Sequence, residues 1–216
     1  MEISSKLIDI VKKADKYSPR PSFYSFVMSE KEIVLFDKTI RNSKVYLEFG
    51  TGGSTFRTLL NSSAKIYSVD SDLNWIRSMQ RYWLIKYHKN RRLHFFHVDI
   101  GPTREWGYLI DEDSRKIFPD YSSSVFNSVE KNEIDTVLID GRFRIACTLK
   151  TILECHANKN LVILIHDFWN RPAYYVLLKY IREIAAADTL GVFKLRDNVN
   201  LNFIKEDYEL YKFDCR

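Results

Sequence analysis

The stretch VYLEFGTGGST, residues 45–55, decides the fold of this chain. A short apolar run ends at Glu48 and a glycine cluster, and hydroxyl residues follow. The chain has 7 glycines, and three of them lie within four positions here, as expected where the backbone turns sharply or a ligand approaches it. Ser54 and Thr55 are natural N-cap residues, so the first free N–H groups of a helix would point above the glycines. The stretch predicts a strand, a tight turn and a helix beside a nucleotide-type pocket.

The composition is that of one globular domain with a mild basic excess. With 216 residues, 45% of them apolar, the chain can form one substantial core. We expect a single domain over residues 1–216, made of an N-terminal helical extension (1–43) and a core (44–216). The net charge of +5 is compatible with an anionic substrate or nucleic acid and demands neither. The densest basic run, residues 86–92, is open to two interpretations, a solvated helix end or a phosphate-contacting patch.

The cysteines and the N-terminal segment favour a cytoplasmic protein. The chain has 3 cysteines and no C-x-x-C pair, and the odd count leaves one outside any disulfide. The N-terminal segment is amphipathic and charged throughout, which is unlike a signal peptide. No stretch approaches the roughly 20 apolar residues that span a bilayer, so we expect no membrane partner.

Strands and helices alternate along most of the chain. Periodicity predicts strands over residues 45–49, 64–70, 93–99, 133–141, 160–167, 190–195 and 201–213. It predicts helices over residues 4–16, 29–40, 56–60, 72–83, 143–156 and 172–187, with Trp75 and Trp83 as core residues. Strands that are apolar on both faces are typical of a buried parallel sheet. The sequence therefore predicts an α/β fold, a doubly wound and mostly parallel seven-stranded sheet with helices on both faces and a C-terminal antiparallel strand.

Residues 101–125 show no periodicity. An irregular stretch of this length inside a compact domain is usually functional or mobile. It carries Arg104, Trp106, Tyr108 and Tyr121, side chains that could face a substrate. An equally open interpretation is a surface excursion held by aromatic anchors.

Acidic residues recur at the expected carboxyl ends of successive strands. They are Glu48, Asp70, Asp99, Asp140 and Asp167. Open α/β sheets bind ligands at this edge. Asp70 lies 20 positions after Gly50, the spacing at which an acid in a βαβ nucleotide-binding unit reaches ribose hydroxyls. This recurrence is the strongest functional signal in the sequence.

On these residues the chain resembles the class I S-adenosylmethionine-dependent methyltransferases. Their first motif, E/D-x-G-x-G, is matched by Glu48, Gly50 and Gly52. The resemblance covers residues 45–167 by motif and implies a Rossmann-like core. It implies that Asp70 binds the cofactor's ribose and that Asp99 and Ile100 border the adenine. The residues implied at the methionine part are Glu48, Gly50, Thr51, Gly52, Gly53 and Ser54.

The turn favours this cofactor over a dinucleotide. The dinucleotide fingerprint is G-x-G-x-x-G, and Thr55 stands where its third glycine belongs. A pyrophosphate also prefers a helix N-terminus without a neighbouring anion. Glu48 could instead meet a cationic ligand such as the sulfonium cofactor.

The motifs Glu-Phe-Gly-Thr-Gly-Gly-Ser-Thr, Ile-Asp-Gly and Ile-His-Asp resemble those of the small-molecule O-methyltransferases. In their cation-dependent members, acids at the ends of two strands hold a divalent cation, Mg²⁺ or Mn²⁺. Here Asp140 and Asp167 would be the metal and catalytic ligands, although Phe168 replaces the family's usual asparagine. Arg142 and Arg144 follow Asp140, and an arginine can satisfy a carboxylate without a metal. A metal site and a salt-bridged substrate pocket both remain open.

Three further side chains are candidates for the acceptor end. His166 could be a general base, because its unperturbed pKa lies near working pH, or a histidine that is hydrogen-bonded into the fold. Trp106 and Trp169 could line the acceptor site, and a packing role is the alternative for Trp169.

The sequence predicts methyl transfer from S-adenosylmethionine to a hydroxyl oxygen of a small molecule, with a sugar or another polyol among the candidates. The alternatives are a non-catalytic binding module of the same fold, a nucleic-acid methyltransferase and a nicotinamide-dependent oxidoreductase. Nucleic acid is not the expected partner, because the chain lacks an Asn-Pro-Pro-aromatic signature and shows no concentrated basic face. Homo-oligomerisation is compatible with the sequence.

Overall fold

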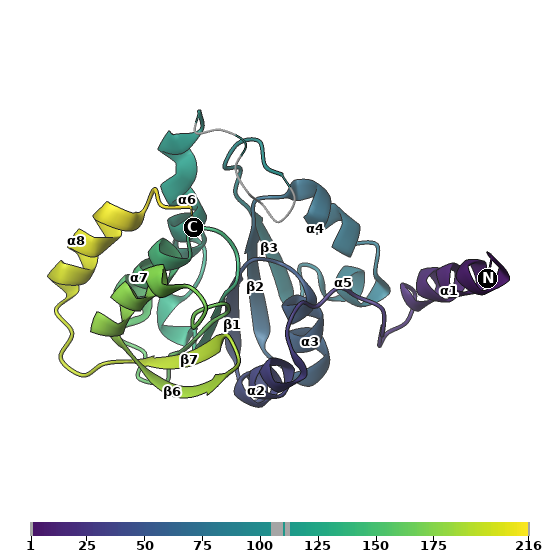
Figure 1. Ribbon diagram of the computed structural model, residues 1–216, viewed down its shortest axis with the longest axis horizontal. Helices are drawn as coiled ribbons and strands as arrows, with labels where there is room; N and C mark the ends of the chain where they lie inside the picture. Colours follow the sequence, from purple (N-terminus) through teal and green to yellow (C-terminus); the bar gives the residue numbers. More distant parts are fainter. Residues whose placement is uncertain (1, 105–109, 111–112, 216) are drawn as a thin grey trace.

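The protein is built around a mixed seven-stranded sheet, seen here in a computed structural model that describes residues 2–104, 110 and 113–215 (Figure 1). The strand order is β3-β2-β1-β4-β5-β7-β6. The strands are β1 (Val45–Phe49), β2 (Lys65–Asp70), β3 (Leu93–His97), β4 (Thr136–Ile139), β5 (Val162–Ile165), β6 (Ile181–Ala187) and β7 (Leu190–Leu195). The pairs from β3 through β5 are parallel, and β7 pairs antiparallel with both β5 and β6. The predicted fold class is confirmed.

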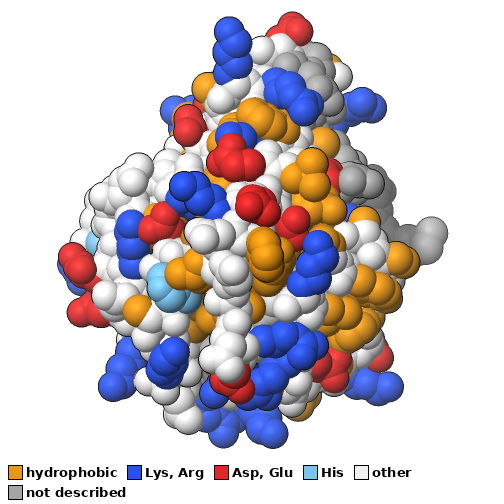
Figure 2. Space-filling view, turned by 90° about the vertical axis from the view of Figure 1, so that its left-hand side faces the viewer, with side chains coloured by type: hydrophobic (Ala, Val, Ile, Leu, Met, Phe, Trp, Pro, Cys, Tyr) orange, Lys and Arg blue, Asp and Glu red, His pale blue; other side chains and the backbone are white. Residues whose placement is uncertain are grey.

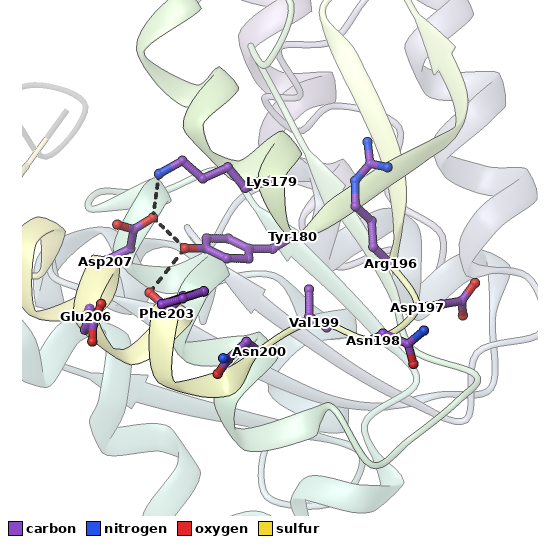
Figure 3. Close-up of a pocket in the computed structure, with 10 residues that line it drawn as sticks. All are labelled: Lys179, Tyr180, Arg196, Asp197, Asn198, Val199, Asn200, Phe203, Glu206 and Asp207. Atoms are coloured by element: carbon purple, nitrogen blue, oxygen red, sulfur yellow. Dashed lines mark hydrogen bonds and ion pairs between the residues drawn. The ribbon is translucent and has the colours of Figure 1, made fainter.

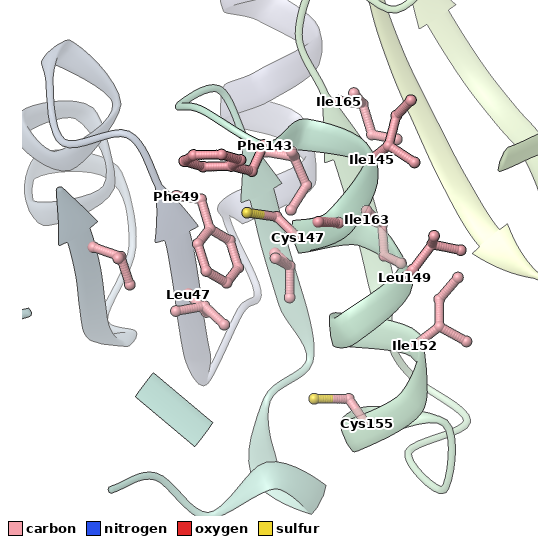
Figure 4. Close-up of a cluster of buried hydrophobic side chains, with 14 of the residues drawn as sticks. Leu47, Phe49, Phe143, Ile145, Cys147, Leu149, Ile152, Cys155, Ile163 and Ile165 are labelled. Carbon is pink, nitrogen blue, oxygen red and sulfur yellow. The ribbon is translucent and has the colours of Figure 1, made fainter. Parts of the chain in front are cut away.

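Helices cover both faces of the sheet. They are α1 (Glu2–Asp15), α2 (Glu30–Ile40), α3 (Gly53–Asn61), α4 (Leu73–Met79), α5 (Trp83–His88), α6 (Phe118–Ser123), α7 (Arg144–Cys155) and α8 (Leu201–Tyr211). Alternate residues of each central strand point to opposite faces. Leu47 and Phe49 of β1 share a core cluster with residues of α6, α7 and α8, and Figure 4 shows them facing α7. Tyr46 belongs to a second cluster with residues of α2, α3 and α5. The sheet is thus buried on both sides, which explains its continuous apolar runs.

The segment predicted as one helix over residues 172–187 has a different structure. A 3₁₀ helix, η5 (Pro172–Lys179), is followed by strand β6. The alanines of β6 favour a helix intrinsically, and its period of two is hidden because Arg182, Glu183 and Ile184 are all exposed at the sheet edge. The predicted helix was therefore wrong over β6, where tertiary pairing with β7 overrides propensity.

The last predicted strand was also wrong. Residues 201–211 form helix α8, which buries Ile204 and Tyr208 one turn apart. The side chain of Asn200 accepts the backbone N–H of Asn202, so it caps a helix. Asparagine serves both turns and N-caps, and the turn interpretation was the wrong one. The antiparallel pair at the end of the sheet is β6–β7 and not β7 with residues 201–213.

The helix predicted after Asp72 is two short helices. Asp72 caps α4 by accepting the N–H groups of Asn74 and Trp75. The chain then breaks at Tyr82, whose ψ of 134° is extended, and α5 begins at Trp83. Trp75 and Trp83 are 39% and 41% exposed, so their assignment to the core was wrong.

The N-terminal segment reaches the first turn of α3. Helix α1 extends away from the sheet (Figure 1), and its last residue, Asp15, accepts the N–H groups of Ser22 and Phe23. Phe26 then packs so closely on α3 that a Cβ on Gly53 would lie 2.4 Å from the Phe26 Cβ. Residues 22–26 thus cover the start of the helix that follows the glycine turn. None of the helices in the described part of the chain is long and apolar enough to cross a membrane.

Candidate functional site

The glycine turn lies where the ends of β1 and β4 meet. Gly50 has φ +100°, and a Cβ there would lie 2.7 Å from the Gly141 nitrogen and 2.8 Å from the Asp140 carbonyl carbon. Only glycine fits both this φ and this approach of two backbones. A Cβ on Gly52 would instead meet nothing within 4 Å. The turn is therefore closed toward the sheet at Gly50 and open at Gly52.

Thr51 is held at the centre of the turn by three contacts. Its backbone N–H donates to Oδ2 of Asp70 over 2.8 Å. Its hydroxyl lies 2.7 Å from that of Ser68, and its carbonyl accepts the indole N–H of Trp75 over 2.7 Å. These contacts fix the peptide groups of the turn before any ligand binds.

Glu48 lies beneath the turn. It is fully buried and accepts hydroxyl hydrogen bonds from Tyr46, Ser54, Thr55 and Ser68. Burial raises its pKa to about 7, although the hydroxyl donors oppose the shift. This placement differs from the direct contact with a cationic ligand that the sequence suggested. Glu48 instead fastens the first turn of α3 from below, through the side chains of Ser54 and Thr55.

Asp70 and the end of β3 lie side by side next to the turn. The carboxylate of Asp70 accepts the N–H groups of Thr51 and Asp72 over 2.8 and 2.9 Å, and burial raises its pKa to about 6. Its carbonyl accepts the N–H of Val98, which begins the segment that carries Asp99 and Ile100. Asp99 is exposed and accepts the N–H of Gly101 over 2.9 Å, whereas Ile100 is buried.

At the neighbouring strand ends, Arg144 joins Asp140 to Asp167. Its guanidinium lies 3.1 Å from Asp140 and 3.3 Å from Asp167, and its side chain is 5% exposed. It also donates to the backbone carbonyls of Gly141 and His166. Burial would raise the pKa of Asp167, but the positive charges around it, with Arg144 first, outweigh burial and lower that pKa.

His166 lies between two carboxylates. Its Nδ1 is 2.9 Å from Asp140, and its Nε2 is 3.6 Å from Glu32 of α2. Burial would lower the pKa of this imidazole, but the hydrogen bond and charge of Asp140 outweigh burial and raise it. The ring is thus hydrogen-bonded into the fold, as in one of its two interpretations, and its role as a general base stays a prediction.

The donor set does not fit a divalent cation. In the ranges that the structure describes, no three His, Cys, Asp or Glu side chains are grouped closely enough to hold a metal. The guanidinium of Arg144 occupies the position between Asp140 and Asp167 that a shared cation would need. Of the two arrangements left open by the sequence, the structure has the salt-bridged one, and the expected Mg²⁺ or Mn²⁺ site is not supported.

The remaining residues that the sequence proposed for the site differ in where they lie. Arg142 is buried at the end of β4. Trp169 packs edge-on against Phe168 with ring centroids 4.9 Å apart, as in its packing interpretation. Trp106 and Tyr108 lie outside the described residues. Tyr121 reaches the site edge from α6, since a Cβ on Gly141 would lie 2.2 Å from its hydroxyl oxygen.

Two residues of the site were missed. Arg171 donates to Asp167 over 2.8 Å, and Glu32 faces His166 while accepting the N–H groups of Thr189 and Leu190. Asp167 and Arg171 do not lie on one helix, so their spacing of four residues did not predict the pair. Glu32 was noted only as a capping-box residue, a role that the structure confirms.

A separate cavity of about 500 Å³ lies near the opposite edge of the sheet, between η5, the end of β7 and α8 (Figure 3). Three of its polar side chains pair with one another. The Tyr180 hydroxyl and the Lys179 ammonium both donate to Asp207, over 2.7 and 3.1 Å. This cavity is not part of the strand-end site.

Solved structures resemble this chain in fold. A methyltransferase-like protein from Silicibacter pomeroyi superposes with a TM-score of 0.76 at 23% identity, over 92% of this chain and all of its own. The chain has a methyltransferase-like fold. A protein from Corynebacterium glutamicum gives a TM-score of 0.53 at 7% identity, over 80% of this chain and 83% of its own. No family model and no curated protein sequence matches the chain.

Proposed function

We propose that this protein transfers a methyl group from S-adenosylmethionine to a hydroxyl oxygen of a small molecule. The observation that carries the proposal is the Gly50–Gly52 turn, which is closed toward the sheet, fastened from below and open above, in a chain with a methyltransferase-like fold. Such a turn presents fixed backbone groups to a ligand at the carboxyl edge of the sheet. Methyl transfer is the activity that this fold and this site support best.

The residues around the turn fit the cofactor. The peptide groups of Gly50, Thr51, Gly52, Gly53 and Ser54 would contact its methionine part. Asp70 would accept its ribose hydroxyls, since each carboxylate oxygen keeps a lone pair beyond the N–H it already accepts. Asp99 and Ile100 would border the adenine. Glu48 would act indirectly, by holding the first turn of α3.

The acceptor would lie at the ends of β4 and β5. S-adenosylmethionine supplies, when bound, a methyl group on a positive sulfur, and the electron pair of the broken C–S bond stays on that sulfur. The side chain of Asp140 is 27% exposed and is held by Arg144 and His166. It would accept a hydrogen bond from the acceptor hydroxyl and take its proton as the oxygen–carbon bond forms. The protein contributes mainly positioning, since the donor is already activated.

Isothermal titration with S-adenosylmethionine and with S-adenosylhomocysteine tests the proposal directly. We expect binding of both, together with thermal stabilisation, because a ligand that binds the native state raises its melting temperature. Asp70→Asn should weaken binding by roughly 1.5–3 kcal/mol, the contribution of a hydrogen bond to a charged group. Asp197→Asn, in the remote cavity of Figure 3, is the matched control. Failure of both ligands to bind would refute the proposal.

A further inference from the structure

The segment that contains α4 and α5, residues 73–92 and here called the α4–α5 surface, has only basic charged side chains, and the acid Asp72 precedes it as the N-cap of α4. Its sequence contains six lysines and arginines and no aspartate or glutamate. Arg92 is half-buried and donates to the carbonyls of Thr58 and Leu59. The five exposed cations are Arg77, Arg81, Lys86, Lys89 and Arg91.

These exposed cations are distinguished by their clustering, because exposed cations that form no ion pair with a described residue, such as Lys159 and Arg182, also occur singly elsewhere. Within the described part of the chain, none of the five has a carboxylate oxygen within 4.0 Å. Elsewhere some lysines pair with acids, as Lys150 does with Glu154 and Lys212 with Glu209. The face of the molecule shown in Figure 2 likewise mixes basic and acidic side chains. Charge on the α4–α5 surface is therefore concentrated and not neutralised locally.

Flat groups are stacked on the same surface. The rings of Trp83 and Tyr87 are stacked with centroids 4.8 Å apart and planes 13° apart. The guanidinium of Arg91 lies 4.7 Å from the centre of the Tyr87 ring. Trp83 and Tyr87 are nevertheless 41% and 46% exposed. The three side chains, each four residues from the next, form a stacked column that is open to solvent.

The basic surface continues past α5 toward the N-terminal helix. The ammonium of Lys16 lies 5.4 Å from the centre of the Tyr82 ring. A groove of about 620 Å³ is lined by Lys12, Lys13, Lys16 and Tyr82, and one acid, Asp9, also lines it. Asp15, the acid at the end of α1, has its carboxylate engaged by the N–H groups of Ser22 and Phe23. A chain-like anion could therefore follow cations from α4 to α1.

We infer that the α4–α5 surface binds single-stranded nucleic acid. Unpaired, exposed cations match the regular negative charges of a phosphate backbone. Exposed aromatic and guanidinium planes match bases, which stack on such groups when they are free of a duplex. The inference does not depend on the proposed methyl transfer. It replaces the expectation of a chain without a concentrated basic face, because folding places the basic residues of α4 and α5 together with the exposed rings.

A structural role for the column does not account for the whole surface. Aromatic pairs four residues apart stabilise an isolated helix by about 0.2–0.5 kcal/mol, and α5 has 6 residues. That contribution explains the contact of Trp83 with Tyr87. It does not explain five exposed cations over residues 77–91, a segment with no aspartate or glutamate, because clustered cations repel one another unless an anion is bound.

Fluorescence anisotropy with a 5′-fluorescein-labelled 12-nucleotide oligouridylate tests the inference. The triple variant Arg77→Gln/Arg81→Gln/Lys86→Gln removes three charges from the α4–α5 surface. The matched control Lys159→Gln/Arg182→Gln/Lys205→Gln removes three exposed charges elsewhere. We expect the first to weaken binding about tenfold or more and to reduce the slope of log K against log salt by about 2, as for three lost phosphate contacts. Equal weakening by both triples would overturn the inference.

Stacking is tested separately from charge. Trp83→Leu should weaken oligouridylate binding roughly five- to 150-fold, the range for loss of one base–aromatic stack. An RNA duplex should bind more weakly than the single strand, because its bases are not free to stack. An unchanged affinity for Trp83→Leu, equal binding of the duplex, or binding to phosphatidylserine vesicles without binding to RNA would each overturn the inference. Circular dichroism melting and titration with S-adenosylmethionine show whether the fold and the cofactor turn survive in each variant.

Discussion

The two halves of the strand-end site hold their carboxylates in opposite ways. At the glycine turn, Glu48 and Asp70 accept only neutral donors, hydroxyls and backbone N–H groups, and burial raises both pKa values. At the ends of β4 and β5, Asp140 and Asp167 contact Arg144, and the pKa of Asp167 is lowered. Hydroxyl and N–H donors keep the backbone of the turn in place and, within the described ranges, leave the charge of Glu48 and Asp70 unpaired. At the ends of β4 and β5, the charge of Arg144 is instead paired with those of Asp140 and Asp167.

Removing the central cation should produce the largest effect on this contrast. In Arg144→Met, Asp140 and Asp167 keep their burial and lose their shared partner. We expect the free energy of unfolding to fall by about 3–5 kcal/mol in urea denaturation, as for other broken buried ion pairs. Lys150→Met, which breaks an i,i+4 pair with Glu154 that is closer to solvent, should cost at most about 1 kcal/mol.

The double variant Arg144→Met/Asp167→Asn separates lost charge from lost packing. It should recover part of the stability lost in Arg144→Met, since one unpaired charge is removed. If the double variant is no more stable than the single one, the ionic account of this half of the site is wrong.

The neutral half should make stability depend on pH. Glu48 has a folded-state pKa near 7, above its ordinary 4.5, so the native state binds more protons than the unfolded state between these values. The contribution of Glu48 is therefore lost as pH rises from about 4.5 to 7, and it amounts to up to roughly 3 kcal/mol. Urea denaturation of the wild type and Glu48→Gln across pH 5–8 measures it.

A matched acid gives the opposite sign. Burial raises the pKa of Glu154, but Lys131 and Lys150 outweigh burial and lower it. Its contribution is present above its ordinary pKa and is lost as pH falls through the lowered value, below pH 5. Glu154→Gln should therefore leave the pH 5–8 profile unchanged. A Glu48→Gln profile that is parallel to the wild type would contradict the raised pKa.

Substitutions at two glycines of the turn should distinguish an effect on stability from an effect on ligand binding. Gly50→Ala adds a Cβ against backbone atoms at positive φ and should cost about 1–3 kcal/mol of stability. Gly52→Ala adds a Cβ to open space at a φ of −177°, so its melting temperature should stay close to the wild type. If the cofactor occupies that space, Gly52→Ala should still weaken its binding in calorimetric titration. Unchanged affinity would place the ligand elsewhere.

Chelation should have the smallest effect. Because Arg144 already bridges Asp140 and Asp167, we expect cofactor binding, and methyl transfer to any acceptor that is found, to be the same before and after exhaustive treatment with EDTA. Loss of activity that added Mg²⁺ or Mn²⁺ restores would show that the ionic half of the site rearranges around a cation.

Local patterns were sufficient for the core of the fold. The glycine turn, the five parallel strands and the acids at their ends are each marked within about ten residues of sequence, by apolar runs, glycines and spacing. Residues 181–187 and 201–211 were misassigned because their structure depends on partners. The edge strand pairs with β7, and α8 packs on α7.

The site was less predictable than the fold. Arg144 could be suspected of pairing with Asp140, which lies four residues away, but only the geometry shows that it also reaches Asp167. The contact of Glu32 with His166 joins residues of distant segments, so no spacing could reveal it. Trp83 is exposed at the start of α5, directly after the extended Tyr82. The apolar pattern of the sequence runs through Tyr82 without a sign of this break.

The contacts of Glu32 also bear on the order in which the protein folds. This one side chain accepts hydrogen bonds from Thr189 and Leu190, more than 150 residues further along the chain. Closing so long a loop costs conformational entropy, and this cost is met before the contacts at its ends stabilise the chain. Contacts between residues far apart in sequence therefore tend to form late in folding. The contacts of Glu32 with residues 189 and 190 should therefore form late, and a nascent chain would make them only after the β6–β7 hairpin has been synthesised.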